Sequence, residues 1–193
     1  MAVVLTLCVA ALPLGTQAPA FSLPDPSGEV VSLDDFKEAK ALVVTFICNH
    51  CPFVKHVQKE LVKIHKDYAP KGVGLVAINA NDWSTYPGDS PENMAKEIKK
   101  VGYKFPYLVD ESQEVALAYQ ARCTPDTFVF DGKRTLVYHG QIDDSRPGKD
   151  IPVTGQDLRA ALDAVLAGET PSKEQEPSVG CSIKWKPGNT PED

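Results

Sequence analysis

The stretch ALVVTFICNHCPFVKHVQKEL, residues 41–61, contains an apolar segment that ends in two cysteines, Cys48 and Cys51, with a histidine between them. Residues 41–47 form a continuous β-branched and apolar run, which is typical of a strand buried on both faces. Pro52 follows the second cysteine, and a proline fits the first turn of a helix, where its missing N–H costs nothing. The stretch therefore predicts a buried strand that turns directly into a helix, with both thiols at the turn.

The rest of the chain continues this alternation. Apolar residues three or four apart predict that the helix from Pro52 ends near Pro70 and Gly72. The further expected elements are extended pieces at 21–23 and 30–33, a strand at 73–80, a helix at 90–102 capped by Ser90, a strand at 107–110, a short helix at 112–120, a hairpin of strands 127–131 and 135–140, and a helix at 155–168. Strands that alternate with helices predict an α/β fold, and the hairpin makes its central sheet a mixed one flanked by helices.

Composition limits the function classes. The chain has 193 residues, of which 42% are hydrophobic and 24% charged, as expected of a globular protein with one main domain. Its formal net charge is −6, and no stripe of lysines and arginines stands out, so we expect no nucleic-acid partner. Five cysteines are too few for a disulfide-stapled scaffold, and their odd number leaves at least one thiol unpaired.

The two ends differ from the middle of the chain. Residues 1–15 form an apolar arm that lacks the basic start and the cleavage site of a signal peptide and is too short to span a bilayer. We therefore expect the arm to pack on a domain at 16–168, no membrane span, and a cytoplasmic location, with export as the alternative. The tail at 169–193 includes VGCSIKW (179–185), which is apolar enough to pack back onto the domain.

The expected turn has consequences for thiol chemistry. Backbone N–H groups and the partial positive charge at the helix start stabilise a thiolate at Cys48, and the thiolate is the nucleophile in disulfide exchange. We assign the residues between the cysteines, Asn49 and His50, to tuning that thiolate. A structural zinc site needs four ligands, and no second pair with suitable spacing exists, so no metal is expected. A redox pair with Cys51 as the resolving thiol is favoured, with a purely structural pair as the alternative.

CNHCP at such a turn, followed by ARCTPDTFVFD (121–131), resembles a protein of the thioredoxin fold. The resemblance implies that Pro125 has a cis peptide bond and that Thr124 and Pro125 shape a substrate groove beside the thiols. LPLGTQAPAFSLPDPSGEVVSLDDF (12–36) resembles the N-terminal extension of the redoxin or peroxiredoxin-like branch, the AhpC/TSA type. Within that branch, VAINAND and GCSIKWKPGN are similar to segments of proteins whose active site is C-N-H-C-P.

Departures from these patterns are equally informative. Thioredoxins usually carry a tryptophan where this chain has Ile47 and a buried aspartate where it has Leu42, so the usual proton acceptor for the second cysteine is missing. Peroxiredoxins carry P-x-x-x-T-x-x-C; here Thr45 and Cys48 supply the second half, but Ala41 replaces the proline. This half-match keeps a thiol peroxidase with Cys48 as the peroxidatic cysteine as the alternative function.

We therefore predict a thiol-disulfide oxidoreductase of the thioredoxin fold, with Cys48 as nucleophile and Cys51 as resolving thiol. The expected partners are a disulfide-containing protein or low-molecular-weight thiol and an external thiol reductant, and no cofactor is expected beyond the redox-active disulfide. A histidine between the cysteines predicts a reduction potential less negative than about −270 mV, the thioredoxin value. Cys123 and Cys181 are candidate additional redox thiols. A non-catalytic binding module is the second alternative.

Overall fold

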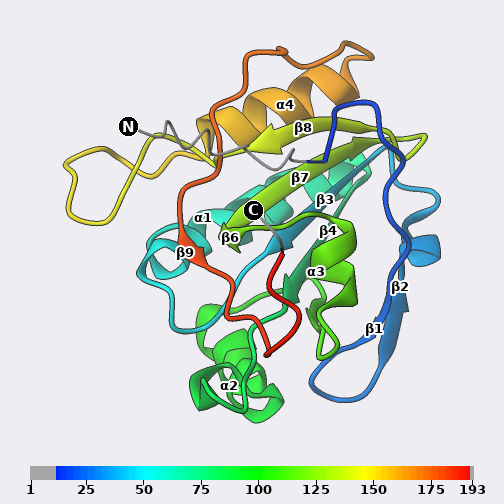
Figure 1. Ribbon diagram of the computed structural model, residues 1–193. Coiled ribbons are helices and arrows are strands. Elements are labelled where there is room, and N and C mark those ends of the chain that lie inside the picture. Colours follow the sequence, from blue (N-terminus) through cyan, green and yellow to red (C-terminus); the bar gives the residue numbers. More distant parts are fainter. Residues whose placement is uncertain (1–11, 192–193) are drawn as a thin grey trace, which may run out of the picture.

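A five-stranded sheet with the strand order β5-β4-β3-β7-β8 lies at the centre of the computed structural model, which describes residues 12–191 (Figure 1). Its strands are β3 (Ala41–Phe46), β4 (Val73–Asn79), β5 (Tyr107–Val109), β7 (Asp126–Asp131) and β8 (Leu136–Gly140). Strand β3 is parallel to β4 and antiparallel to β7, β4 is parallel to β5, and β7 and β8 form an antiparallel hairpin. The predicted mixed sheet and hairpin are therefore confirmed.

All six residues of β3 are buried, because side chains alternate between two apolar layers on opposite faces of the sheet. Val43 belongs to a layer shared with helices α1 (Pro52–Tyr68), α2 (Pro91–Val101) and α4 (Gln156–Leu166). Leu42 and Val44 belong to the other layer, which includes α3 (Glu114–Ala118) and the hairpin of β1 (Ser22–Pro24) and β2 (Val30–Ser32). The continuous apolar run thus correctly predicted a strand covered on both faces.

Helix ends follow the expected signals closely. Pro52 is the first residue of α1. The helix is followed by a short 3-10 turn, Ala69–Lys71, which ends at Gly72 with a φ of 92°. Ser90 is the N-cap of α2, where its hydroxyl accepts a hydrogen bond from the Asn93 amide at 3.4 Å. Gly102 ends α2 in the left-handed conformation that glycine adopts without strain.

The described part of the N-terminal arm leads into a segment that lies beside the start of β8. The Gly15 amide donates to the Leu136 carbonyl at 2.8 Å, and the Leu136 amide donates to the Thr16 carbonyl at 2.8 Å. Leu12 is buried in the same layer as β1. The rest of the predicted arm, including Cys8, lies outside the described residues. Between residues 12 and 191, no helix is both long and apolar enough to cross a membrane.

The C-terminal tail returns from α4 to the sheet, as the orange-to-red trace in Figure 1 shows. It contributes β9 (Cys181–Ser182), which pairs antiparallel with β6 (Cys123–Thr124). The side chain of Ile183 is 3% exposed and belongs to the apolar layer that holds Leu42. Neither of these two short strands was predicted, and their pairing places the tail beside the turn that carries the two cysteines.

Candidate active site

The turn between β3 and α1 brings the two expected redox thiols together. Cys48 lies two residues after the end of β3, and Cys51 is the N-cap of α1. Both thiols contact Thr124: the Cys48 sulfur lies 3.3 Å from its hydroxyl and the Cys51 sulfur 3.1 Å from its carbonyl oxygen. The Thr124–Pro125 peptide bond is cis, as the resemblance implied. Sequence-distant segments thus form a single thiol cluster.

Both thiols of the pair are covered. Cys48 is 2% exposed and Cys51 is 0% exposed. Thr124 and Pro125 are buried as well, and the strand edge at Thr124 pairs with Cys181 of the tail. The edge expected to form an open substrate groove is therefore occupied by the chain's own β9. Cys181 is only partly buried, and its sulfur lies 3.0 Å from the Cys51 sulfur.

Hydrogen bonds decide where a negative charge in this cluster resides. The neighbouring Cys48 thiol lowers the pKa of Cys51; burial opposes the shift, and the Cys181 thiol and the Val54 amide reinforce it. The pKa of Cys48 is raised by sharing its proton with Cys51, by burial and by the nearby Asp89 carboxylate. In the reduced cluster, Cys51 and Asp89 therefore oppose the expected thiolate at Cys48, which stays a prediction. The Thr124 carbonyl, 3.1 Å from the Cys51 sulfur, favours a protonated Cys51 and limits the lowering of its pKa.

The residues between the cysteines contact a buried carboxylate. His50 Nδ1 lies 2.6 Å from Asp89 Oδ2, and the Asn49 amide donates to Asp89 Oδ1 at 2.7 Å. The Asn49 side-chain oxygen accepts a hydrogen bond from Tyr107 at 3.1 Å. Asn49 and His50 therefore hold Asp89 beside Cys48, and its negative charge opposes a thiolate there.

Asp89, which the sequence analysis did not select, is completely buried. It lies in the loop between β4 and α2, where the Asn81 side chain donates to its Oδ2 at 2.8 Å. Tyr86 of the same loop stacks on His50 with ring centroids 5.5 Å apart. Nothing in the sequence distinguishes Asp89 from the other carboxylates of this loop.

Cys48, His50 and Asp89 also place one sulfur, one nitrogen and one oxygen within 4.8 Å of one another, the separation expected of potential metal ligands. The two Asp89 oxygens, however, already accept hydrogen bonds from Asn49 and Asn81 and face His50. These contacts satisfy the carboxylate without an ion, so the geometry fits a hydrogen-bonded cluster better than a metal centre.

Two further predicted features lie at the border of the cluster. Cys123, the other candidate redox thiol, points its sulfur at the Pro125 carbonyl oxygen, 3.5 Å away. Burial and the Asp126 carboxylate raise the pKa of Cys123, which disfavours a reactive thiolate there. Thr45, the threonine of the half-matched peroxidase motif, shares a hydrogen bond with Thr127 at 3.0 Å inside the sheet.

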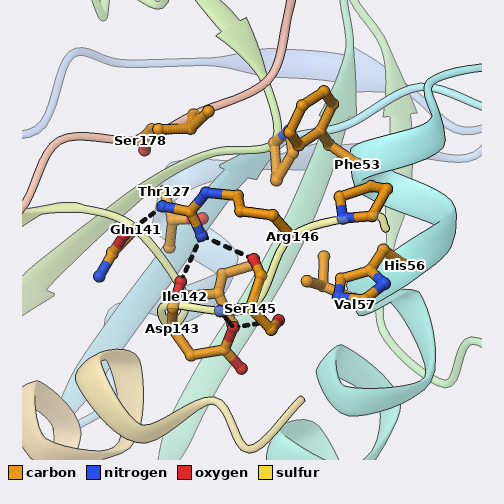
Figure 2. Close-up of a pocket in the computed structure, with 13 residues that line it drawn as sticks. Phe53, His56, Val57, Thr127, Gln141, Ile142, Asp143, Ser145, Arg146 and Ser178 are labelled. Carbon is orange, nitrogen blue, oxygen red and sulfur yellow. Dashed lines mark hydrogen bonds between the residues drawn. The ribbon is translucent and has the colours of Figure 1, made fainter. Parts of the chain in front are cut away.

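A small pocket lies next to the cluster, between α1 and the chain that follows β8 (Figure 2). Phe53 and His56 of α1 line one side, and the tail residue Ser178 borders it. The Arg146 guanidinium spans the other side and donates to the carbonyl oxygens of Asp143 and Ser145 at 2.6 and 2.7 Å. The pocket has a volume of about 20 Å³, which holds about one water molecule, so it is too small for a substrate.

Known proteins support the fold and the chemical class. The model of the AhpC/TSA family matches residues 14–139. The thiol-disulfide oxidoreductase ResA of Halalkalibacterium halodurans is 29% identical over 129 residues, 66% of this chain and 65% of that protein; the chain therefore spans just under two thirds of that relative. That name agrees with the predicted oxidoreductase class.

Solved structures extend the similarity over most of the chain. An uncharacterized conserved protein from Geobacillus kaustophilus is 60% identical, with a TM-score of 0.89 over 91% of this chain and 94% of that one. The thioredoxin domain of a thiol-disulfide oxidoreductase from Bacteroides vulgatus is 19% identical, with a TM-score of 0.61 over 79% of this chain and 99% of that one. The second similarity confirms the predicted thioredoxin fold.

Proposed function

The chain belongs to the AhpC/TSA family in the redoxin branch of the thioredoxin superfamily, and we propose that it is a thiol-disulfide oxidoreductase acting through Cys48 and Cys51. The observation that carries the proposal is the contact of both thiols with Thr124, the residue that precedes Pro125 and its cis peptide bond. This arrangement holds the two sulfurs of one turn against the same residue, and their two-residue spacing lets them approach within the distance of a disulfide bond.

In the proposed reaction, the Cys48 sulfur attacks a substrate disulfide while its proton passes to Cys51. The leaving substrate sulfur takes up a proton, and a mixed disulfide joins Cys48 to the substrate. The Cys181 thiol and the Val54 amide, which favour a charged Cys51, remain beside it in the mixed disulfide; Cys51 releases its proton and attacks the Cys48 sulfur. This second exchange releases the reduced substrate and leaves a Cys48–Cys51 disulfide. The reverse sequence oxidises a dithiol with the same residues.

The proposed substrate is a disulfide-containing protein or a low-molecular-weight disulfide, and the electron donor is an external thiol. The redox group is the disulfide of the pair, so the reaction needs no other cofactor. A substrate chain that pairs with the Thr124 edge must first displace β9, because this edge already pairs with Cys181.

The first test is the redox titration of the Cys181→Ser variant, which keeps the pair and removes the third nearby thiol. The protein is equilibrated in glutathione buffers, and its thiols are trapped by alkylation and located by mass spectrometry. We expect one two-electron transition at Cys48 and Cys51 between about −270 and −120 mV. The Cys123→Ser variant serves as a control and should not change the transition.

The absence of a Cys48–Cys51 disulfide in this titration contradicts the proposal. A stable sulfenate at Cys48 after exposure to hydrogen peroxide, with turnover that disappears in Cys48→Ser, would instead support the peroxidase alternative. Retention of a bound partner after both cysteines are replaced by serine would support the binding-module alternative.

A further inference from the structure

A third thiol contacts the pair from the opposite end of the sequence. The Cys181 sulfur lies 3.0 Å from the Cys51 sulfur, about 1 Å more than the length of a disulfide bond. Cys51 therefore lies between two possible partners, Cys48 in the same turn and Cys181 in the tail. Cys48 and Cys51 are buried, whereas Cys181 is partly exposed.

The backbone around Cys181 is built for this contact. Cys181 pairs with Thr124 in the short β6–β9 ladder, and the Ile183 amide donates to the Arg122 carbonyl at 3.2 Å. A Cβ atom on Gly180 would lie 2.1 Å from the Thr124 carbonyl oxygen, a separation that no real Cβ contact has. Only glycine at this position lets the tail lie so close to the cluster.

Contacts on both sides of β9 fix the tail over the pair. After the strand, the Lys184 amide donates to Asn81 at 2.8 Å, and the Gln113 side chain donates to the Lys184 carbonyl at 2.9 Å. Before the strand, the Gln141 amide donates to the Glu176 carbonyl at 2.9 Å. These anchors make the Cys51–Cys181 contact a feature of the folded domain rather than a chance approach of a loose end.

We propose that Cys181 is a second resolving thiol, which takes over the disulfide formed by Cys48 and Cys51 and presents it to the external reductant. This inference rests on the proposed function and adds a step to it. Cys181 gives up its proton, and its sulfur bonds to the Cys51 sulfur. The Cys48–Cys51 bond breaks, and Cys48 leaves as a thiolate that takes up a proton. One disulfide is exchanged for another, so the step needs no oxidant or reductant.

The relay moves the disulfide from a covered position to an accessible one. In a Cys51–Cys181 disulfide, the partly exposed sulfur belongs to Cys181, so an external thiol attacks there and displaces Cys51. Cys51 is the better leaving group of the two, because neighbouring hydrogen bonds lower its pKa whereas burial and the contact with Cys51 raise that of Cys181. A second external thiol then resolves the mixed disulfide on Cys181.

Disulfide mapping over time tests the relay. Reduced wild-type protein is mixed with one equivalent of oxidised glutathione, quenched at intervals with acid, alkylated and digested. We expect the Cys48–Cys51 peptide pair to appear first and the Cys51–Cys181 pair to replace it. Gly180→Ala keeps the thiol but displaces the strand, and it should lower the yield of the second pair at least tenfold. Cys123→Ser should behave like the wild type.

A rate measurement completes the test. Oxidised Cys181→Ser should react with excess reduced glutathione at least tenfold more slowly than the oxidised wild type, while it forms its Cys48–Cys51 bond at the wild-type rate. Wild-type protein that forms Cys48–Cys51 without any Cys51–Cys181, or a variant reduced as fast as the wild type, overturns the relay alone. Failure of both proteins to form Cys48–Cys51 overturns the proposed function. Circular dichroism of each variant verifies that it is folded.

Discussion

Asp89→Asn should make Cys48 more acidic, because the Asp89 carboxylate faces the Cys48 sulfur within 4.8 Å. Two unit charges 4.8 Å apart repel by about 3.5 kcal/mol at an effective dielectric constant of about 20. This energy corresponds to about 2.5 pKa units. The hydrogen bonds that the carboxylate accepts from the Asn49 amide and the Asn81 side chain spread its charge and weaken the repulsion. We therefore expect the pKa of Cys48 to fall by about one to two units in the variant.

The assay follows thiolate absorbance against pH in a background where Cys48 is the only cysteine, so that no second thiol shares its proton. Asp82→Asn is the matched control. Asp82 is a buried residue of the same loop, and its carboxylate accepts hydrogen bonds from the hydroxyls of Ser84 and Thr85. It should leave the Cys48 midpoint unchanged. An unchanged or higher midpoint in Asp89→Asn, with the fold intact by melting, would refute the electrostatic reasoning.

Three further outcomes follow from single contacts. Thr124→Val removes the hydroxyl 3.3 Å from the Cys48 sulfur and should raise the Cys48 pKa by about one unit in the same titration. Burial disfavours the charged form of Asp143, but hydrogen bonds from a serine hydroxyl and three backbone amides outweigh it and lower its pKa. The stability that Asp143 contributes is therefore present above pH about 4 and lost as the pH falls through its folded-state pKa. Asp143→Asn should lower the free energy of unfolding by about 2 kcal/mol at neutral pH and by less in acid, measured by urea unfolding. Ile183→Ala should cost about 2 to 5 kcal/mol and speed amide exchange in the tail, whereas Val179→Ala, at a side chain 44% exposed, should do neither.

The fold was largely predictable because its signals are local. Residues 41–47 are apolar at every position, and Pro52, Ser90 and Gly102 mark helix boundaries through backbone geometry that each residue satisfies by itself. The pairing of β6 with β9 was not predictable in the same way. Both strands are two residues long, and their contact joins positions nearly sixty apart, so no periodicity records it.

The clustering of the two thiols with Thr124 was predictable, but the charges around them were not. The spacing of Cys48 and Cys51 and the proline at position 125 identified the cluster, since each is a property of a short segment. The charge next to Cys48 depends instead on a loop thirty-nine residues from His50 that folds over the turn. A rule based on the helix start alone places the thiolate at Cys48, whereas the folded chain adds Asp89 beside it and the Cys181 thiol beside Cys51.

The missing aspartate at position 42 gains a physical explanation from this cluster. Leu42 is fully buried and pairs with Phe130 in the sheet, within the apolar layer opposite α1. The contacts that lower the pKa of Cys51 come from the thiols of Cys48 and Cys181 and from backbone amides, with no carboxylate among them. Cys181 would then both receive the disulfide and help to ionise Cys51. Accordingly, Cys181→Ala should raise the pKa of Cys51, measured as a shift of its alkylation midpoint to higher pH. An unchanged midpoint would show that Cys181 does not help to ionise Cys51.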